Sequence, residues 1–124
     1  MPYIVGVPPV TKQTLELTAG LVDSSISTTT STGISTLVSI ESSIYRSANY
    51  QIQVVQGTNY NSTSINLIHD GTTAYMTEYG TLNQPTGVAT FSADINSGKI
   101  RLLGYPGTAS TTVFKVVYLS LIHI

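Results

Sequence analysis

Residues 45–81 have the sequence YRSANYQIQVVQGTNYNSTSINLIHDGTTAYMTEYGT, in which apolar and polar residues alternate over three successive segments. A period of two is the pattern of β-strands that bury one face. In the first segment, one face holds Ala48, Tyr50, Ile52 and Val54. The second segment spans 64–69 and the third 73–79. Three such segments without a helical period predict an antiparallel sheet.

The turns between these segments contain the residue types that tight turns require. Gly57-Thr58-Asn59 separates the first two segments, and Asp70-Gly71 separates the last two. An Asp-Gly pair favours a type I′ turn, which needs positive φ at both central residues. We therefore expect a β-hairpin whose register is fixed by Asp70 and Gly71.

The rest of the chain predicts more strands, and together they indicate an all-β fold. Further strand candidates are 13–22, 34–41, 88–95, 99–105 and 111–122, with a tight turn at 96–98. The Ser/Thr-rich run 23–33, DSSISTTTSTG, favours a long loop, with a mobile edge strand as the alternative. About eight strands roughly ten residues apart predict an antiparallel β-sandwich, jelly-roll-like in architecture. The competing architecture is a β-rich fibre segment that folds only as an intertwined trimer.

The 124 residues suffice for one domain, and we expect a single β-sandwich over 12–124. Residues 1–11 are expected to form an extended N-terminal arm, because three prolines stand among apolar residues there. An apolar arm either packs on its own domain or lies on a neighbouring subunit. In the second case its interface residues are Tyr3, Ile4, Val5, Val7 and Val10.

The segment 111–122 is apolar on both faces. One face holds Val113, Val117, Leu119 and Leu121. The other holds Phe114, Val116, Tyr118 and Ile122. Such a strand lies between two layers or is covered by another chain. We expect the set Phe114, Val116, Tyr118 and Ile122 to contribute to an interface with other proteins.

Low charge favours partners that are proteins. Charged residues make up 9% of the chain, the net charge is −1, and the five Lys and Arg residues are scattered. Scattered cations argue against nucleic acid, and a near-neutral surface tolerates association, so we expect a homo-oligomer, with a trimer favoured. The chain has no cysteine, no apolar run of membrane-spanning length and no signal sequence after Met1, so we expect no membrane partner.

Three groups of residues could carry chemistry, and each has a structural interpretation that we favour. His69-Asp70 lacks the nucleophile framework of a hydrolytic triad, which favours a structural histidine beside a turn. The segment 94–98, DINSG, lacks the later acidic residues of a calcium loop. Five tyrosines could form a platform for sugar or protein, or simply pack within the sheet: Tyr45, Tyr50, Tyr60, Tyr75 and Tyr79. We expect no enzymatic activity, no cofactor and no metal site.

Four segments carry a resemblance to a known family. They are YRSANYQIQVVQG (45–57), INLIHDGTTAYMTEYGTL (65–82), FSADINSGKIRLL (91–103) and TTVFKVVY (111–118). Together they resemble a β-domain in structural proteins of tailed phages of marine bacteria, cyanophages in particular. This resemblance implies a virion component, assembled in the host cytoplasm and without an enzymatic role. It implies partners among other virion proteins, either the major capsid protein or tail components.

The resemblance leaves the position on the particle open. We expect a capsid decoration or cement protein, because the chain is small, carries little charge and has apolar ends. A tail, neck or fibre component is the first alternative. A carbohydrate-binding module for host attachment is the second, and it would use the tyrosines.

Overall fold

The computed structural model describes residues 14–122 of the chain, so the expected arm over 1–11 lies outside the described residues. Residues 14–122 form nine strands. These are β1 (Leu15–Glu16), β2 (Gly20–Thr29), β3 (Ser35–Glu41), β4 (Tyr45–Gln56), β5 (Asn59–His69), β6 (Ala74–Gln84), β7 (Ala89–Asn96), β8 (Lys99–Pro106) and β9 (Thr112–Ile122). The described part of the chain contains no helix long and apolar enough to cross a membrane.

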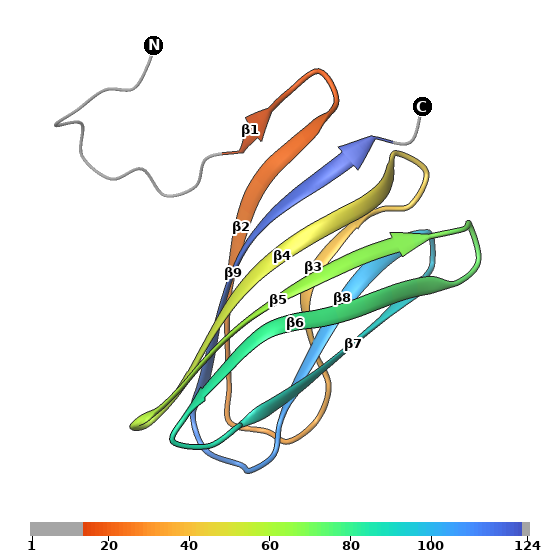
Figure 1. Cartoon of the computed structure of the whole chain (residues 1–124). Coiled ribbons are helices and arrows are strands. Elements are labelled where there is room, and N and C mark those ends of the chain that lie inside the picture. Colours follow the sequence, from red (N-terminus) through yellow and green to blue (C-terminus); the bar gives the residue numbers. More distant parts are fainter. Residues whose placement is uncertain (1–13, 123–124) are drawn as a thin grey trace, which may run out of the picture.

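The strands form two antiparallel sheets that pack as a sandwich, which confirms the predicted fold class (Figure 1). The larger sheet has the order β1-β2-β9-β4-β5-β6, and the smaller has the order β3-β8-β7. As in a jelly roll, early strands pair with late ones, β2 with β9 and β3 with β8. The meander β4-β5-β6 widens one sheet to six strands. The larger sheet therefore extends beyond the smaller one.

The core lies between the two sheets. The alternation seen in the sequence is confirmed, because Tyr50, Ile52 and Val54 of β4 all point inward and are buried. Phe91 of β7 and Phe114 of β9 join the sheets through an edge-to-face contact, with ring centroids 6.1 Å apart. Other buried core side chains include Leu37, Val38, Ile40, Ala48, Ile65, Leu67, Val88, Ile100, Leu102, Val116 and Tyr118.

Two predictions about the N-terminal third of the chain are wrong. The strand expected over 13–22 is broken by a turn between Leu17 and Gly20, whose backbone groups bond to each other at 2.7 and 3.3 Å. The Ser/Thr run 23–33 is not a long loop but is nearer to its alternative, an edge strand, since β2 continues to Thr29, pairs with β9 along its whole length and pairs with β1 only at Leu21 and Val22. Its hydroxyl side chains are small enough for a strand, and the apolar β9 supplies the partner that stabilises it.

The turns form as tight hairpins at two of the three expected places. Gly57 has a φ of 61° and, with Thr58, connects β4 to β5. Ser97 and Gly98 have φ of 52° and 77°, the positive pair that a two-residue type I′ turn requires. The type I′ turn predicted at Asp70-Gly71 is wrong, because only Gly71 has positive φ and the connection spans residues 70–73.

The Asp70 carboxylate explains the longer connection. Its Oδ1 accepts hydrogen bonds from the backbone N–H of Thr72 at 3.0 Å and of Thr73 at 2.8 Å. Its Oδ2 accepts a bond from the Tyr75 hydroxyl at 2.9 Å. These bonds, the Thr72 backbone first, lower the pKa of Asp70 below its usual range. The side chain, not backbone φ at Asp70, therefore organises this hairpin.

Candidate functional site

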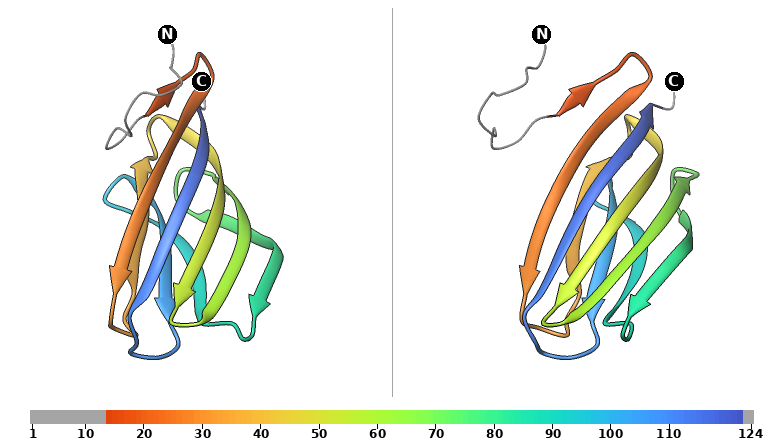
Figure 2. Two further views of the ribbon diagram at one scale, coloured as in Figure 1. Left: turned by 90° about the vertical axis from the view of Figure 1, so that its left-hand side faces the viewer. Right: turned by 60° about the vertical axis from the view of Figure 1, so that its left-hand side comes forward.

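The side of the six-stranded sheet that faces away from the smaller sheet is the candidate site, and we call it the outer face (Figure 2). Strand register shows which side chains lie on it, because directly paired residues share a face. One cross-strand row consists of Ser24, Val117, Gln51, Ser64 and Tyr79. The next row consists of Ile26, Lys115, Gln53, Ser62 and Leu82. Lys115 is the one charged side chain that the register of these five strands places on the outer face.

The outer face concentrates the exposed apolar side chains. Of the thirteen large hydrophobic residues exposed among the described residues, ten lie on it. They are Leu15, Ile26, Tyr60, Ile68, Tyr75, Tyr79, Leu82, Val117, Leu119 and Leu121. A sheet face with this many exposed apolar side chains and almost no charge is typical of a surface that binds another protein.

Nine of these ten residues, all but Leu15 of β1, form two stripes with an amide stripe between them. The β9 stripe consists of Val117, Leu119 and Leu121 with Ile26 of β2, and the β6 stripe consists of Tyr75, Tyr79 and Leu82 with Tyr60 and Ile68 of β5. Between them β4 contributes the amide stripe, Asn49, Gln51 and Gln53.

The amide stripe is held in place by hydrogen bonds along the sheet. The Gln51 amide donates to Ser62 at 3.3 Å and accepts from Ser64 at 2.7 Å. The Asn49 amide donates to the Tyr79 hydroxyl at 2.9 Å. These bonds fix the amide groups of Asn49 and Gln51 before any partner arrives, which lowers the entropic cost of binding.

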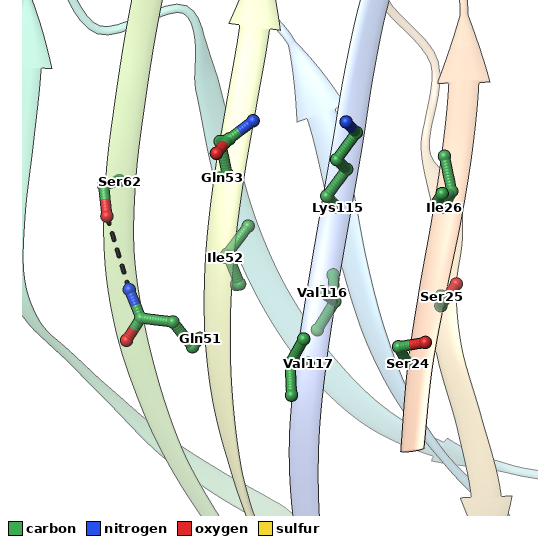
Figure 3. A pocket seen from close by; sticks show the side chains of 10 residues that line it. All are labelled: Ser24, Ser25, Ile26, Gln51, Ile52, Gln53, Ser62, Lys115, Val116 and Val117. Carbon is green, nitrogen blue, oxygen red and sulfur yellow. Dashed lines mark hydrogen bonds between the residues drawn. The ribbon is translucent and has the colours of Figure 1, made fainter. Parts of the chain in front are cut away.

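Three shallow hollows line the outer face. One of about 450 Å³ lies between β2, β9, β4 and β5, and Figure 3 shows Gln51, Gln53 and Lys115 around it. A second, of about 430 Å³, lies beside Ile68 and Tyr75, and a third, of about 400 Å³, lies beside Tyr60 and Leu82. All three are open depressions between side chains, which suits contact with protruding side chains of a partner.

No family model matches the chain, and no curated protein matches it. Among solved structures, the chain is similar to the crystal structure of the tailspike protein of the Acinetobacter phage vB_ApiP_P1. The TM-score is 0.48 and the sequence identity is 19%. The match covers 99% of this chain and 24% of the tailspike chain, so this chain spans only that part of the tailspike's length.

The residues of the last strand that were expected to contact other proteins are mostly buried inside the domain. Phe114, Val116 and Tyr118 are buried in the core, so they are not available to a partner of the folded domain. Ile122 lies at the end of β9 and is partly buried. The opposite face of β9 is the exposed one, with Val117 at 55% exposure. The arm residues Tyr3, Ile4, Val5, Val7 and Val10 lie outside the described residues.

The five tyrosines proposed as a platform are divided between the two faces of the sheet. Tyr50 is fully buried, and Tyr45 packs against the core. Tyr60, Tyr75 and Tyr79 are exposed on the outer face. Only these three can contact a ligand, and two of their hydroxyls already bond to Asp70 and Asn49.

His69 and Asp70 form part of the hairpin structure. His69 is buried, and its Nδ1 accepts a hydrogen bond from the Gly71 backbone N–H at 2.9 Å. Its Nε2 lies 2.7 Å from the Tyr45 carbonyl oxygen, and because Nδ1 accepts, Nε2 carries the proton and donates. Both ring nitrogens therefore hold backbone groups, which agrees with the structural interpretation of this histidine.

The 94–98 segment is a hairpin. Arg101 donates two hydrogen bonds to Asp94, at 2.8 and 2.6 Å. This bidentate pairing lowers the pKa of Asp94 and occupies both carboxylate oxygens. Within the described range 14–122, no three His, Cys, Asp or Glu residues gather where they could hold a metal ion.

Sequence reasoning missed the contribution of β2 to the outer face. Ile26 is 68% exposed there, but it stands within the Ser/Thr run, whose composition predicts a loop. The sequence signal for this face is the second apolar side of 111–122, formed by Val113, Val117, Leu119 and Leu121, which predicts a strand that another layer or another chain covers. Which of the two faces is buried depends on the packing of the smaller sheet.

Proposed function

We propose that this chain is a structural component of a phage particle that binds neighbouring virion proteins and performs no catalysis. The observation that supports this most strongly is the outer face, on which strand register places ten exposed large hydrophobic residues and one charged side chain among residues 14–122. The segments that resemble phage structural proteins, 45–57 and 65–82 above all, form β4, β5 and β6 of the same sheet. Recognition by protein contact fits such a surface.

Within the particle, we propose a position in the tail, neck or fibre assembly. The chain enters β1 and leaves β9 at one end of the sandwich, where Gly20 pairs with Leu121 (Figure 1). The β4–β5 and β8–β9 connections lie at the opposite end of the sandwich. We propose that this opposite end projects from the assembly. The outer face runs along the side between these ends, where neighbouring subunits of an elongated structure would meet.

Capsid decoration is the second candidate, and the apolar sequence of residues 2–11 favours it. Such a segment could add affinity through contacts with the shell, multiplied by many copies. Deletion of residues 1–11 should then abolish particle binding while circular dichroism still reports the folded sandwich. Unchanged binding to particles would eliminate the arm from the proposal.

Carbohydrate binding is tested separately because it predicts a different ligand. Tyr60, Tyr75 and Tyr79 would provide the stacking surfaces. A glycan array that gives signal with the unaltered chain and none with Tyr75→Ala or Tyr79→Ala would support this function. A silent array would leave protein binding as the proposal.

Immunoelectron microscopy tests the main proposal. An antibody against the purified chain is applied to particles of a phage that encodes it. Label on the tail supports the tail assignment, and label on the head supports capsid decoration. Particles that carry no label and contain no peptide of this chain by mass spectrometry would contradict the virion function.

A further inference from the structure

We propose that the outer face of the six-stranded sheet is a docking surface for a second copy of this chain, related by a twofold axis. This inference deepens the proposed function by naming a partner for the same face. It rests on the pattern, size and charge of that face.

The pattern of the face is self-complementary. The amide stripe on β4 lies between the β9 stripe and the β6 stripe. A twofold axis along β4, between two facing copies, sets β9 of one against β5 of the other, so that Val117 meets Ser64 and Leu119 meets Asn66. A twofold axis across the strands sets each stripe against its own copy. The second arrangement sets apolar side chains against apolar side chains and amides against amides, as an isologous interface requires, and it is the one that we propose.

The size of the face matches what a stable dimer needs. Strands β2, β9, β4, β5 and β6 are 10, 11, 12, 11 and 11 residues long. At a spacing of about 4.8 Å and a rise of about 3.3 Å per residue, five strands of about ten residues cover roughly 800 Å². Interfaces of standard size bury about 800 Å² on each partner.

The charge on the face permits a second copy to approach. Lys115 is the one charge that the strand register places there, and it lies one row away from Val117 and Gln51. A twofold axis through the Gln51 row keeps the two Lys115 side chains apart on either geometry. A strongly charged partner would find no complementary charges on this surface, whereas a second copy of the face brings only one charged side chain, Lys115.

The hollows provide space for side chains of the second copy. The hollow of about 450 Å³ beside Val117 and Gln51 lies near the centre of the face. Those of about 430 and 400 Å³ lie at the β6 stripe, next to Tyr75 and Leu82 respectively. Packed sheets lie about 10 Å apart, so apolar side chains of one copy can enter the hollows of the other.

Analytical ultracentrifugation of the full chain tests the inference. We expect a species of about twice the 13.2 kDa chain mass. Combined Val117→Asp and Leu119→Asp substitution should weaken the dimer at least tenfold, because it buries carboxylates in an apolar interface. Ile34→Asp is the matched control, since Ile34 is 68% exposed but lies in the β2–β3 connection, and it should leave the dimer unchanged. A monomer or a trimer in the unaltered chain, or a dimer that survives both aspartates, would overturn the inference.

Crosslinking provides a readout that does not depend on the stability of the variants. The chain has no cysteine, so a single introduced thiol reports one position. Gln51→Cys at the centre of the face should give a covalent dimer with a bismaleimide of about 10 Å span, the separation of packed sheets. Thr90→Cys, exposed on β7 of the smaller sheet, should not. Equal crosslinking of the Gln51→Cys and Thr90→Cys variants would count against the outer face as the dimer interface. A chain that is monomeric alone yet present in particles overturns this inference while the proposed function stands.

Discussion

Tyr50 of β4 and Tyr118 of β9 lie opposite each other in the core, with ring centroids 5.7 Å apart, and their hydroxyls have different surroundings. The Tyr118 hydroxyl lies close enough to Asp23 of β2 for that carboxylate to raise its pKa. The Tyr50 hydroxyl is buried and has no hydrogen-bond partner. A buried hydroxyl without a partner costs stability, whereas a bonded one does not. The pair therefore gives opposite expectations for the same chemical change.

Tyr50→Phe should leave the free energy of unfolding unchanged or raise it by about 1 kcal/mol, because it removes an unpaired polar atom from the core. Tyr118→Phe should lower the free energy of unfolding by about 1 kcal/mol, since it removes the favourable interaction of this hydroxyl with the Asp23 carboxylate. Urea denaturation followed by circular dichroism measures both values. Equal losses for the two variants would show that the Tyr50 hydroxyl does have a partner.

The same two tyrosines predict the loss of stability in alkali. Burial, reinforced by Asp23, raises the pKa of Tyr118 to about 12. Burial also raises the pKa of Tyr50 above its ordinary value of 10.0. Because the folded pKa values exceed the unfolded one, the protonated tyrosines stabilise the fold fully below pH 10, and this contribution is lost as the pH rises through 12. Denaturation curves between pH 8 and about 12 should show this decline, and it should be smaller in the Tyr50→Phe, Tyr118→Phe double variant.

Asp70 predicts a loss of stability in acid. Its folded pKa lies below the ordinary value of 3.8, chiefly because its carboxylate accepts backbone bonds from Thr72 and Thr73. The stabilisation is therefore complete above pH 3.8 and declines as the pH falls below it. Asp70→Ala should lower the melting temperature at pH 7 and reduce this decline, because the variant has no carboxylate to protonate. A melting temperature equal to that of the unaltered chain would contradict the role of the carboxylate in the hairpin.

The structure leaves no room for a side chain at Gly20, where β2 begins. A Cβ atom at this position would lie 2.1 Å from the backbone oxygen of Ser120 on β9. Gly20→Ala should therefore destabilise the domain by about 1–3 kcal/mol, or force β2 away from β9. Gly107→Ala is the matched control, since nothing lies within 4 Å of its Cβ position and its φ is not in the left-handed region. Thermal melts that rank the two variants in the reverse order would contradict the described β2–β9 pairing.

The strands that alternate clearly were predictable from the sequence. Tyr50, Ile52 and Val54 point inward as their spacing predicts, and Ser97-Gly98 forms the expected tight turn. Short-range rules suffice there because each segment carries its own pattern. They fail for β2, whose Ser/Thr residues have no apolar period and whose strand conformation depends on β9, roughly ninety residues later in the chain.

The candidate site was harder to predict than the fold. The sequence shows that 111–122 has two apolar faces, but it does not show which of them the smaller sheet covers. That choice is made by the contact between Phe114 and Phe91, which turns Val117 and Leu119 outward. The prediction of a type I′ turn at Asp70-Gly71 failed for a different reason. The Asp70 carboxylate accepts two hydrogen bonds from backbone N–H groups, and these bonds favour a longer connection over the type I′ geometry.

If the outer face is the docking surface of this domain, another polypeptide must cover it in the assembled particle. A cryo-EM map of the phage that encodes the chain, resolved well enough to separate strands, measures this directly. We expect density of a neighbouring chain against Val117, Leu119 and Leu82, which are 55%, 38% and 71% exposed in the isolated domain. An outer face that is open to solvent in every copy on the particle would contradict its role as a docking surface.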